Sequence, residues 1–310
     1  MDKIPKIELW PTMLTPFQQN GEVDYKALGR LIDWYIENGS TGLFAVCQSS
    51  EMFFLSLEER KKIASFVCEK AAGRVPVIAS GHISDSFDDQ VRELTEMAET
   101  GVSAVILVPN RLAPEDAPEA AFLDRLDRLV NRIPGGIPLG FYECPYPYKK
   151  LLTPGMVRYC VESGRFLFLK DTSCNLADIH AKLQLMTGSK FRLFNANTST
   201  LLESLKEGAA GYSGVMANVQ PEIYRWLLSN WKAQPQKAER VQEFLTLCSL
   251  IESHAYPMVA KYILQEYGLQ IGTFCRTIKE TSLTDTYRLE ARQLKALSQE
   301  VEKKLSARAM

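Results

Sequence analysis

Eight short apolar runs alternate with amphipathic stretches along most of the chain, and this alternation restricts the fold more than any other feature. The runs begin at residues 7, 43, 76, 104, 138, 166, 191 and 208. Alternating strands and helices predict an α/β protein with a parallel sheet, and eight such units predict a closed (β/α)8 barrel, or TIM barrel. A doubly wound sheet is the alternative, but the segment after the first run, PTMLTPFQQNG, lacks the Gly-rich nucleotide loop expected there.

The stretches between the runs have the spacing of amphipathic helices. Residues 25–39 carry an apolar stripe that extends from Leu28 to Ile36. Farther along, Ser56 and Glu59 have the spacing of a capping box, which marks the beginning of a helix. These signals support helices between the predicted strands.

The pattern changes after residue 232, where helical stretches follow one another without intervening strands. We therefore predict two segments, a barrel domain over residues 1–232 and a C-terminal helical extension over residues 233–310. We expect the extension to pack on the barrel or on a neighbouring subunit.

Composition excludes several classes of function. The 310 residues have a formal net charge of −1, so no basic field is available for nucleic acid or for an anionic membrane. The beginning of the chain lacks an apolar signal-peptide core, and no apolar run approaches membrane-spanning length, which predicts a cytoplasmic protein. The 7 cysteines form no CxxC pair and the 3 histidines lie far apart, so we expect neither a zinc site nor a disulfide framework.

A lysine follows the sixth apolar run directly. In GRFLFLKDTSC the residues Phe166 to Leu169 are apolar without alternation, which is typical of a strand buried on both faces. Lys170 is then either a solvated loop residue or a desolvated amine, which loses its proton more easily and becomes a nucleophile. Its position alone leaves both interpretations open.

Active sites of (β/α)8 barrels lie at the carboxyl ends of the strands, so the residues there are candidates. Polar side chains gather at these predicted ends: Gln48, Ser49, Ser50, His82, Arg111, Tyr142, Lys170, Thr172, Asn195 and Ser213. Tyr142 ends the strand that precedes the strand of Lys170. An amine together with a proton-carrying hydroxyl is the pair that amine chemistry on a carbonyl requires. Tyr142 could instead be a rim aromatic, and His82 either lines the pocket or bonds to its neighbours.

Four segments together match the motifs of one known family. Leu14–Phe17 matches a Thr-Pro-Phe element, Cys47–Glu51 aligns with a Gly-Thr-Thr-Gly-Glu loop, Tyr142–Pro145 matches Tyr-Asn-x-Pro, and Lys170 with Thr172 matches a Lys-x-Thr. On these motifs the chain resembles the dihydrodipicolinate synthase and N-acetylneuraminate lyase family of class I aldolases. The resemblance covers about residues 5–300 and includes the helical tail.

The resemblance implies a Schiff base between the Lys170 amine and the ketone of pyruvate or another 2-oxo acid. Tyr142 would relay protons, assisted by Ser49, which replaces a family threonine. No metal and no cofactor are implied, because the protonated imine is itself the electron sink.

Substrate binding is implied at the same strand ends. Backbone amides of residues 48–50 would hold the 2-oxo acid carboxylate, with Gln48 or Ser50 contributing. Further substrate contacts are expected from Thr172, Asn195 and Ser213. We also expect a homo-oligomer, either a tetramer or a dimer.

Three departures from the family pattern restrict the substrate. Cys47 and Ser50 replace two loop glycines, which alters any backbone that requires φ > 0. Pro147 stands where synthases of the lysine precursor carry an arginine. Asn110 and Arg111 replace a tyrosine pair, one of which reaches a neighbouring subunit's site, so the proton relay is incomplete or rerouted. Arg111 either contacts an anionic substrate tail or forms a surface salt bridge.

The sequence thus predicts a Schiff-base-forming lyase that cleaves or dehydrates a 2-oxo acid derived from a sugar. Two alternatives stay open. The protein could condense pyruvate with an aldehyde, as dihydrodipicolinate synthase does, or it could have lost turnover and bind a metabolite.

Overall fold

The computed structural model describes residues 7–306, and its strands form a single parallel sheet. The strands are β1 (Glu8–Leu9), β2 (Leu43–Phe44), β3 (Val77–Ser80), β4 (Ala104–Leu107), β5 (Leu139–Tyr142), β6 (Phe166–Asp171), β7 (Arg192–Asn195) and β8 (Gly211–Tyr212). Their order in the sheet is β1-β8-β7-β6-β5-β4-β3-β2. A parallel bridge between Thr12 and Phe44 joins the two ends of this order, so the sheet closes. The predicted (β/α)8 barrel is confirmed.

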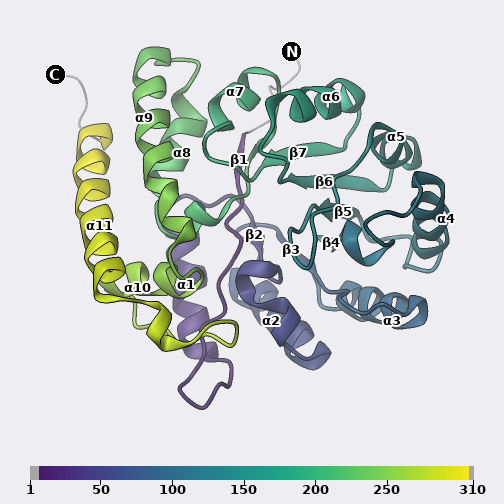
Figure 1. Cartoon of the computed structure of the whole chain (residues 1–310), viewed down its shortest axis with the longest axis horizontal. Helices are drawn as coiled ribbons and strands as arrows, with labels where there is room; N and C mark the ends of the chain where they lie inside the picture. Colours follow the sequence, from purple (N-terminus) through teal and green to yellow (C-terminus); the bar gives the residue numbers. More distant parts are fainter. Residues whose placement is uncertain (1–6, 307–310) are drawn as a thin grey trace.

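Helices surround the sheet (Figure 1). Those of the barrel are α1 (Tyr25–Glu37), α2 (Leu57–Ala71), α3 (Phe87–Ala98), α4 (Glu119–Val130), α5 (Pro154–Ser163), α6 (Leu176–Met186), α7 (Leu201–Lys206) and α8 (Pro221–Asn230). The capping box begins α2 as expected, because the Glu59 N–H donates to Ser56 Oγ and the Ser56 N–H donates to Glu59 Oε2. Short 3₁₀ turns are η1 (Gln48–Ser50), η2 (Met52–Phe54), η3 (Pro109–Arg111), η4 (Val215–Asn218), η5 (Ser249–Ser253) and η6 (Glu280–Ser282).

The C-terminal helices are α9 (Pro235–Cys248), α10 (Met258–Glu266) and α11 (Asp285–Ser306). They cover the side of the barrel that carries α8 and α1 (Figure 1). Helix α11 packs against α8 and α10, and α9 packs against α7 and α8. The predicted boundary after residue 232 falls between α8 and α9 and stays a prediction. Residues 1–6 and 307–310 of the two predicted segments lie outside the described residues.

A buried ion pair fixes this extension to the loop after β2. Lys261 Nζ of α10 lies 2.9 Å from Glu51 Oε1, and both side chains are fully buried. Glu51 Oε2 also accepts hydrogen bonds from the backbone N–H groups of Arg276 and Thr277. Removing one partner of a buried pair leaves an uncompensated charge, so these contacts hold the extension firmly in place.

Aromatic rings fill the interior of the barrel. The rings of Phe168 and Phe194 stack with their centroids 4.5 Å apart, and Trp10 meets Phe168 edge to face at 5.5 Å. This packing leaves the strand ends as the place where polar side chains can gather. Within residues 7–306, no helix combines the length and the apolar character that crossing a membrane requires.

Candidate active site

A cavity of about 360 Å³ lies at the carboxyl ends of the strands and contains Lys170. Strand and loop residues form most of its wall, and the segment between α9 and α10 forms the rest. Its lining residues are Gln48, Ser49, Tyr142, Pro145, Lys149, Lys170, Thr172, Cys174, Ala196, Asn197, Gly214, Val215, Glu252, Tyr256, Pro257 and Thr277.

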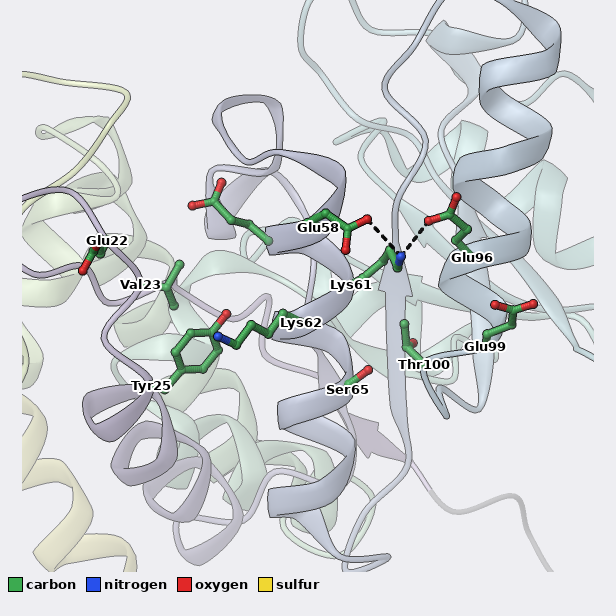
Figure 2. Close-up of a pocket in the computed structure, with 11 residues that line it drawn as sticks. Glu22, Val23, Tyr25, Glu58, Lys61, Lys62, Ser65, Glu96, Glu99 and Thr100 are labelled. Carbon is green, nitrogen blue, oxygen red and sulfur yellow. Dashed lines mark hydrogen bonds and ion pairs between the residues drawn. The ribbon is translucent and has the colours of Figure 1, made fainter.

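A larger groove of about 860 Å³ lies elsewhere, along α2 and α3 on the outside of the barrel. Figure 2 shows Lys61 of this groove between Glu58 and Glu96, at 3.0 and 2.7 Å. The amine of Lys62 lies 4.7 Å from the centroid of the Tyr25 ring. Its lysines are therefore engaged by neighbouring side chains, and none of them follows a strand. We take the smaller cavity as the candidate active site.

Lys170 and Tyr142 are neighbours across β5 and β6. The two residues are partners in the register of these strands, and Lys170 is only 3% exposed. Lys170 Nζ lies 4.5 Å from the centroid of the Tyr142 ring. Burial lowers the pKa of Lys170 to about 8, against the opposing influence of Cys47, Cys144 and Glu252. A larger share of this amine is therefore neutral near pH 7 than in an exposed lysine.

The Tyr142 hydroxyl is positioned by the loop after β2. It donates a hydrogen bond of 3.3 Å to Gln48 Oε1, which also lies 3.4 Å from Cys144 Sγ. Burial raises the pKa of Tyr142 well above its ordinary value, so the hydroxyl keeps its proton and can donate it.

A buried cation holds the ends of β5 and β6 in place. Lys182 Nζ of α6 lies 2.6 Å from Glu143 Oε1 and 2.6 Å from Asp171 Oδ2. Glu143 and Asp171 directly follow Tyr142 and Lys170 in the sequence, and Glu143 Oε2 also accepts from the Thr172 N–H. Because strand side chains alternate, these acids point into the helix layer while Tyr142 and Lys170 line the cavity.

Ser49 bonds to a residue that the sequence analysis did not identify. Its hydroxyl accepts a hydrogen bond of 2.7 Å from Tyr256 Oη and donates one of 3.1 Å to Thr12 Oγ1. Asn218 Nδ2 in turn donates to Tyr256 Oη at 3.3 Å. The hydrogen-bond partners of the Ser49 hydroxyl are thus Tyr256 and Thr12, and its expected assistance to Tyr142 stays a prediction.

Gln48, Ser49, Tyr142, Lys170 and Thr172 thus meet in one cavity, as the sequence predicted for their positions. The Thr172 hydroxyl is already engaged, because it donates to the backbone oxygen of Glu143 at 2.6 Å.

Four predicted substrate contacts lie outside the cavity lining. The Ser50 hydroxyl closes the local turn by bonding to the N–H and the carbonyl oxygen of Cys47. Arg111 pairs with Asp85, which is the contact that the salt-bridge interpretation expects. Asn195 and Ser213 are the other two predicted contacts that do not line the cavity.

Asn195 points away from the cavity because Phe194 occupies the inward position of β7. Its amide nitrogen donates to Thr200 Oγ1 and Ser204 Oγ, and its oxygen accepts from the Asn197 N–H. It therefore organises the turn into α7. Ser213 is fully buried after β8. The cavity is lined one or two residues farther along, by Ala196, Asn197 and Gly214.

The departures from the family pattern have local explanations. Cys47 has φ −156°, and the left-handed residue of the loop is Glu51 at φ 63°, held by Lys261. Asn110 Nδ2 donates to the backbone oxygens of Cys144, Tyr146 and Tyr148, so it shapes the loop after β5.

Neither His82 nor Pro147 lines the cavity. His82 is fully buried, accepts a hydrogen bond of 2.6 Å from the Val108 N–H, and has its pKa lowered to about 3 by burial and nearby arginines. It bonds to its neighbours and does not line the cavity. From the loop after β5, the cavity is lined by Pro145 and Lys149 and not by Pro147. Lys149 Nζ donates a hydrogen bond of 2.9 Å to the backbone oxygen of Thr172.

Sequence reasoning missed Glu252 and Tyr256, which come from the helical extension. Their only signal is a polar and aromatic turn, ESHAYP, between two helices. No spacing connects this turn to the strand ends. Within residues 7–306, no group of three or more His, Cys, Asp or Glu side chains is placed to hold a metal ion.

The fold and the lysine-bearing cavity at the strand ends are those of a class I aldolase-type enzyme. The model of the dihydrodipicolinate synthetase family matches residues 7–296, so the chain belongs to this family. It is 31% identical over 214 residues to the 4-hydroxy-tetrahydrodipicolinate synthase of Cereibacter sphaeroides, covering 69% of this chain and 71% of that protein.

Solved structures share the fold. Dihydrodipicolinate synthase DapA-2 of Bacillus anthracis superimposes with a TM-score of 0.85 at 22% identity, covering 95% of this chain and 99% of the other. YagE, a prophage protein of Escherichia coli solved in complex with pyruvate, gives a TM-score of 0.85 at 21% identity, with 94% and 98% covered.

Proposed function

We propose that the protein is a Schiff-base lyase that cleaves or dehydrates a 2-oxo acid, with Lys170 as the nucleophile. The observation that carries this proposal is the position of Lys170, a residue that is 3% exposed at the end of β6. Burial lowers its pKa to about 8, which favours the neutral form that attacks a ketone. The pyruvate bound to YagE is consistent with this substrate class.

The remaining lining residues have complementary roles. Tyr142 gives a proton to the carbinolamine oxygen, because burial keeps its hydroxyl protonated. The N–H groups of Gln48 and Ser49 hold the 2-oxo acid carboxylate. The Ser50 N–H is excluded from this role, since it donates to the Cys47 oxygen at 3.1 Å.

Borohydride trapping tests the proposal. Incubation with pyruvate and borohydride should inactivate the protein irreversibly and leave a reduced adduct on the peptide that contains Lys170. Lys170→Ala should abolish the adduct. Lys149→Ala is the matched control, because Lys149 is the second lysine of the cavity and should not carry the adduct. An adduct on Lys149, or none with any 2-oxo acid, would overturn the assignment.

Condensation of pyruvate with an aldehyde is the second candidate, supported by the synthase name of the Cereibacter sphaeroides relative. A family member that binds a metabolite without turnover is the third. A panel of 2-oxo acids and aldehydes separates the three, because a binding protein shows affinity without turnover. A homo-oligomeric assembly and a cytoplasmic location stay predictions.

A further inference from the structure

The segment 249–257, between α9 and α10, brings three residues of the extension into the lining of the Lys170 cavity. These are Glu252, Tyr256 and Pro257, and the first two carry polar side chains. Tyr256 fixes the segment to the barrel, because its hydroxyl lies 2.7 Å from Ser49 Oγ and 3.3 Å from Asn218 Nδ2. Glu252 therefore belongs to the wall of the cavity and is held there from the barrel side.

The same segment is also held from the solvent side. The imidazole ring of His254 stacks on the Tyr287 ring of α11, with the centroids 4.4 Å apart. His254 Nδ1 lies 2.9 Å from Glu290 Oε2 of the same helix. With contacts on both sides, Glu252 has a defined position relative to Lys170.

Glu252 is the only carboxylate among the described residues that line the cavity. No side chain within residues 7–306 donates a hydrogen bond to it, so its oxygens are available to a bound molecule. Burial raises the pKa of Glu252 to about 7, and the charge of Lys170 opposes this shift. Such a carboxyl group both takes up and releases a proton near neutral pH.

The tyrosines near Glu252 do not supply a base. The titratable groups that line the cavity with it are Tyr142, Lys149, Lys170, Cys174 and Tyr256. Burial raises the pKa values of Tyr142 and Tyr256 well above the ordinary value, so both keep their protons. Behind the cavity, Tyr212 and Tyr224 also have raised pKa values, to which the charge of Glu252 contributes. The cavity thus places tyrosine hydroxyls that keep their protons beside one carboxylate that can accept a proton.

We propose that Glu252 is the catalytic base that removes the C4 hydroxyl proton of a 4-hydroxy-2-oxo acid held as an imine on Lys170. This assignment rests on the Schiff-base function proposed above and names its substrate class. The proton moves to the Glu252 carboxylate, the electron pair of the broken O–H bond forms the C4 carbonyl, and the C3–C4 bond breaks. Its electron pair moves into the protonated imine, which leaves an enamine of pyruvate and a free aldehyde. Protonation at C3 and hydrolysis by water then release pyruvate and restore the Lys170 amine.

The test compares Glu252→Gln with wild-type protein in two assays. The first is borohydride trapping with pyruvate, and the second is cleavage of 4-hydroxy-2-oxopentanoate and of 3-deoxy-2-oxo sugar acids. Glu252→Gln should still form the Lys170 adduct with pyruvate, yet lose about 10²- to 10⁴-fold in kcat for cleavage. Glu243→Gln is the matched control, because Glu243 is an exposed glutamate of α9 paired with Arg240, and its cleavage rate should not change.

The pH dependence of kcat is a second test, because a purely structural role of Glu252 would leave this dependence unchanged. In wild type, kcat should rise with pH through about 7, because Glu252 acts as a base only when ionised. This rise should be absent in Glu252→Gln. Unchanged cleavage by the variant would overturn the assignment, and so would a wild-type adduct without cleavage of any of these acids. Failure of the proposed function itself is distinct, since wild type would then form no adduct.

Discussion

The hydroxyl of Tyr256 donates a hydrogen bond of 2.7 Å to the hydroxyl of Ser49, although 207 positions separate the two residues in the chain. Ser49 lies in the loop after β2, whereas Tyr256 belongs to the helical extension. The Ser49 hydroxyl in turn donates a hydrogen bond of 3.1 Å to Thr12 Oγ1. The extension is therefore part of the cavity wall, and its position decides where the Ser49 hydroxyl points.

Tyr256→Phe and Ser49→Ala should be coupled. Each substitution removes one side of the hydrogen bond that the two residues share, worth about 0.5–1.5 kcal/mol, and we expect each to lower kcat by roughly 2- to 10-fold. The double variant should be little worse than either single variant, because the second change removes an interaction that is already lost. A double-mutant cycle on kcat measures this coupling. Additive losses would show that the two hydroxyls act independently.

Tyr142→Phe should slow turnover by about 10²- to 10⁴-fold, because it removes the buried hydroxyl that gives a proton to the carbinolamine. Some imine should still form, since the Lys170 amine is unchanged. Steady-state turnover and borohydride trapping together separate the two effects. Full activity in Tyr142→Phe would show that the Tyr142 side chain only packs against its neighbours and takes no part in proton transfer.

The rate of imine formation with pyruvate should rise with pH and reach half of its plateau near pH 8. The reason is that burial lowers the pKa of Lys170 to about 8, and only the neutral amine attacks the ketone. Glu252→Gln should shift this midpoint downward, because the Glu252 charge raises the pKa of Lys170. Trapping rates across a pH series measure both midpoints. A midpoint typical of an exposed lysine would contradict the burial described here.

The barrel and the Lys170–Tyr142 pair could be predicted because both depend on local pattern. Alternating apolar runs mark parallel strands, and consecutive strands bring their carboxyl ends together. The alternation of side chains along a strand also limits the prediction of site residues, because a residue at a strand end can point away from the cavity. Asn195 stands at a strand end, but Phe194 takes the inward position of β7, so the Asn195 side chain turns toward the helices.

Glu252 and Tyr256 could not be predicted, because long-range packing places them. The buried pair of Lys261 with Glu51 holds the extension against the loop after β2, and no periodicity in the sequence reports this contact. No sequence pattern indicates the buried ion pair of Glu143 either. Its partner Lys182 lies 39 positions away on α6, and only the folding of α6 against the neighbouring strands brings them together.

Lys182→Met should destabilise the protein by about 3–5 kcal/mol, because Glu143 and Asp171 would remain buried without their cation. The matched control is Lys206→Met. Lys206 also bridges two acids, Glu203 and Glu239, but on the surface, where such pairs contribute about 0–1 kcal/mol. Urea unfolding of both variants measures the difference. Equal losses would contradict the role given to the buried network.

Condensation of pyruvate with aspartate semialdehyde should be negligible. A carboxylate-bearing aldehyde is best held by a guanidinium through two parallel hydrogen bonds, and neither a proline nor a point-charge ammonium supplies these. Pro147 occupies the position of the arginine in lysine-precursor synthases, and Arg111 is paired with Asp85 outside the cavity lining. Lys149 already donates to the Thr172 oxygen, and Glu252 repels a second carboxylate.

An assay of the purified protein with both compounds at saturating concentration tests this exclusion. Glyceraldehyde is the matched partner, because it offers an aldehyde and hydroxyls without a carboxylate. We expect faster condensation with glyceraldehyde, since its hydroxyls can bond to Glu252 while no second negative charge enters the cavity. Glu252→Gln should narrow the difference between the two aldehydes by removing the repulsion. Turnover of aspartate semialdehyde at the rate of a dedicated synthase would show that Lys149 suffices for carboxylate binding, and condensation would then replace cleavage as the proposed reaction.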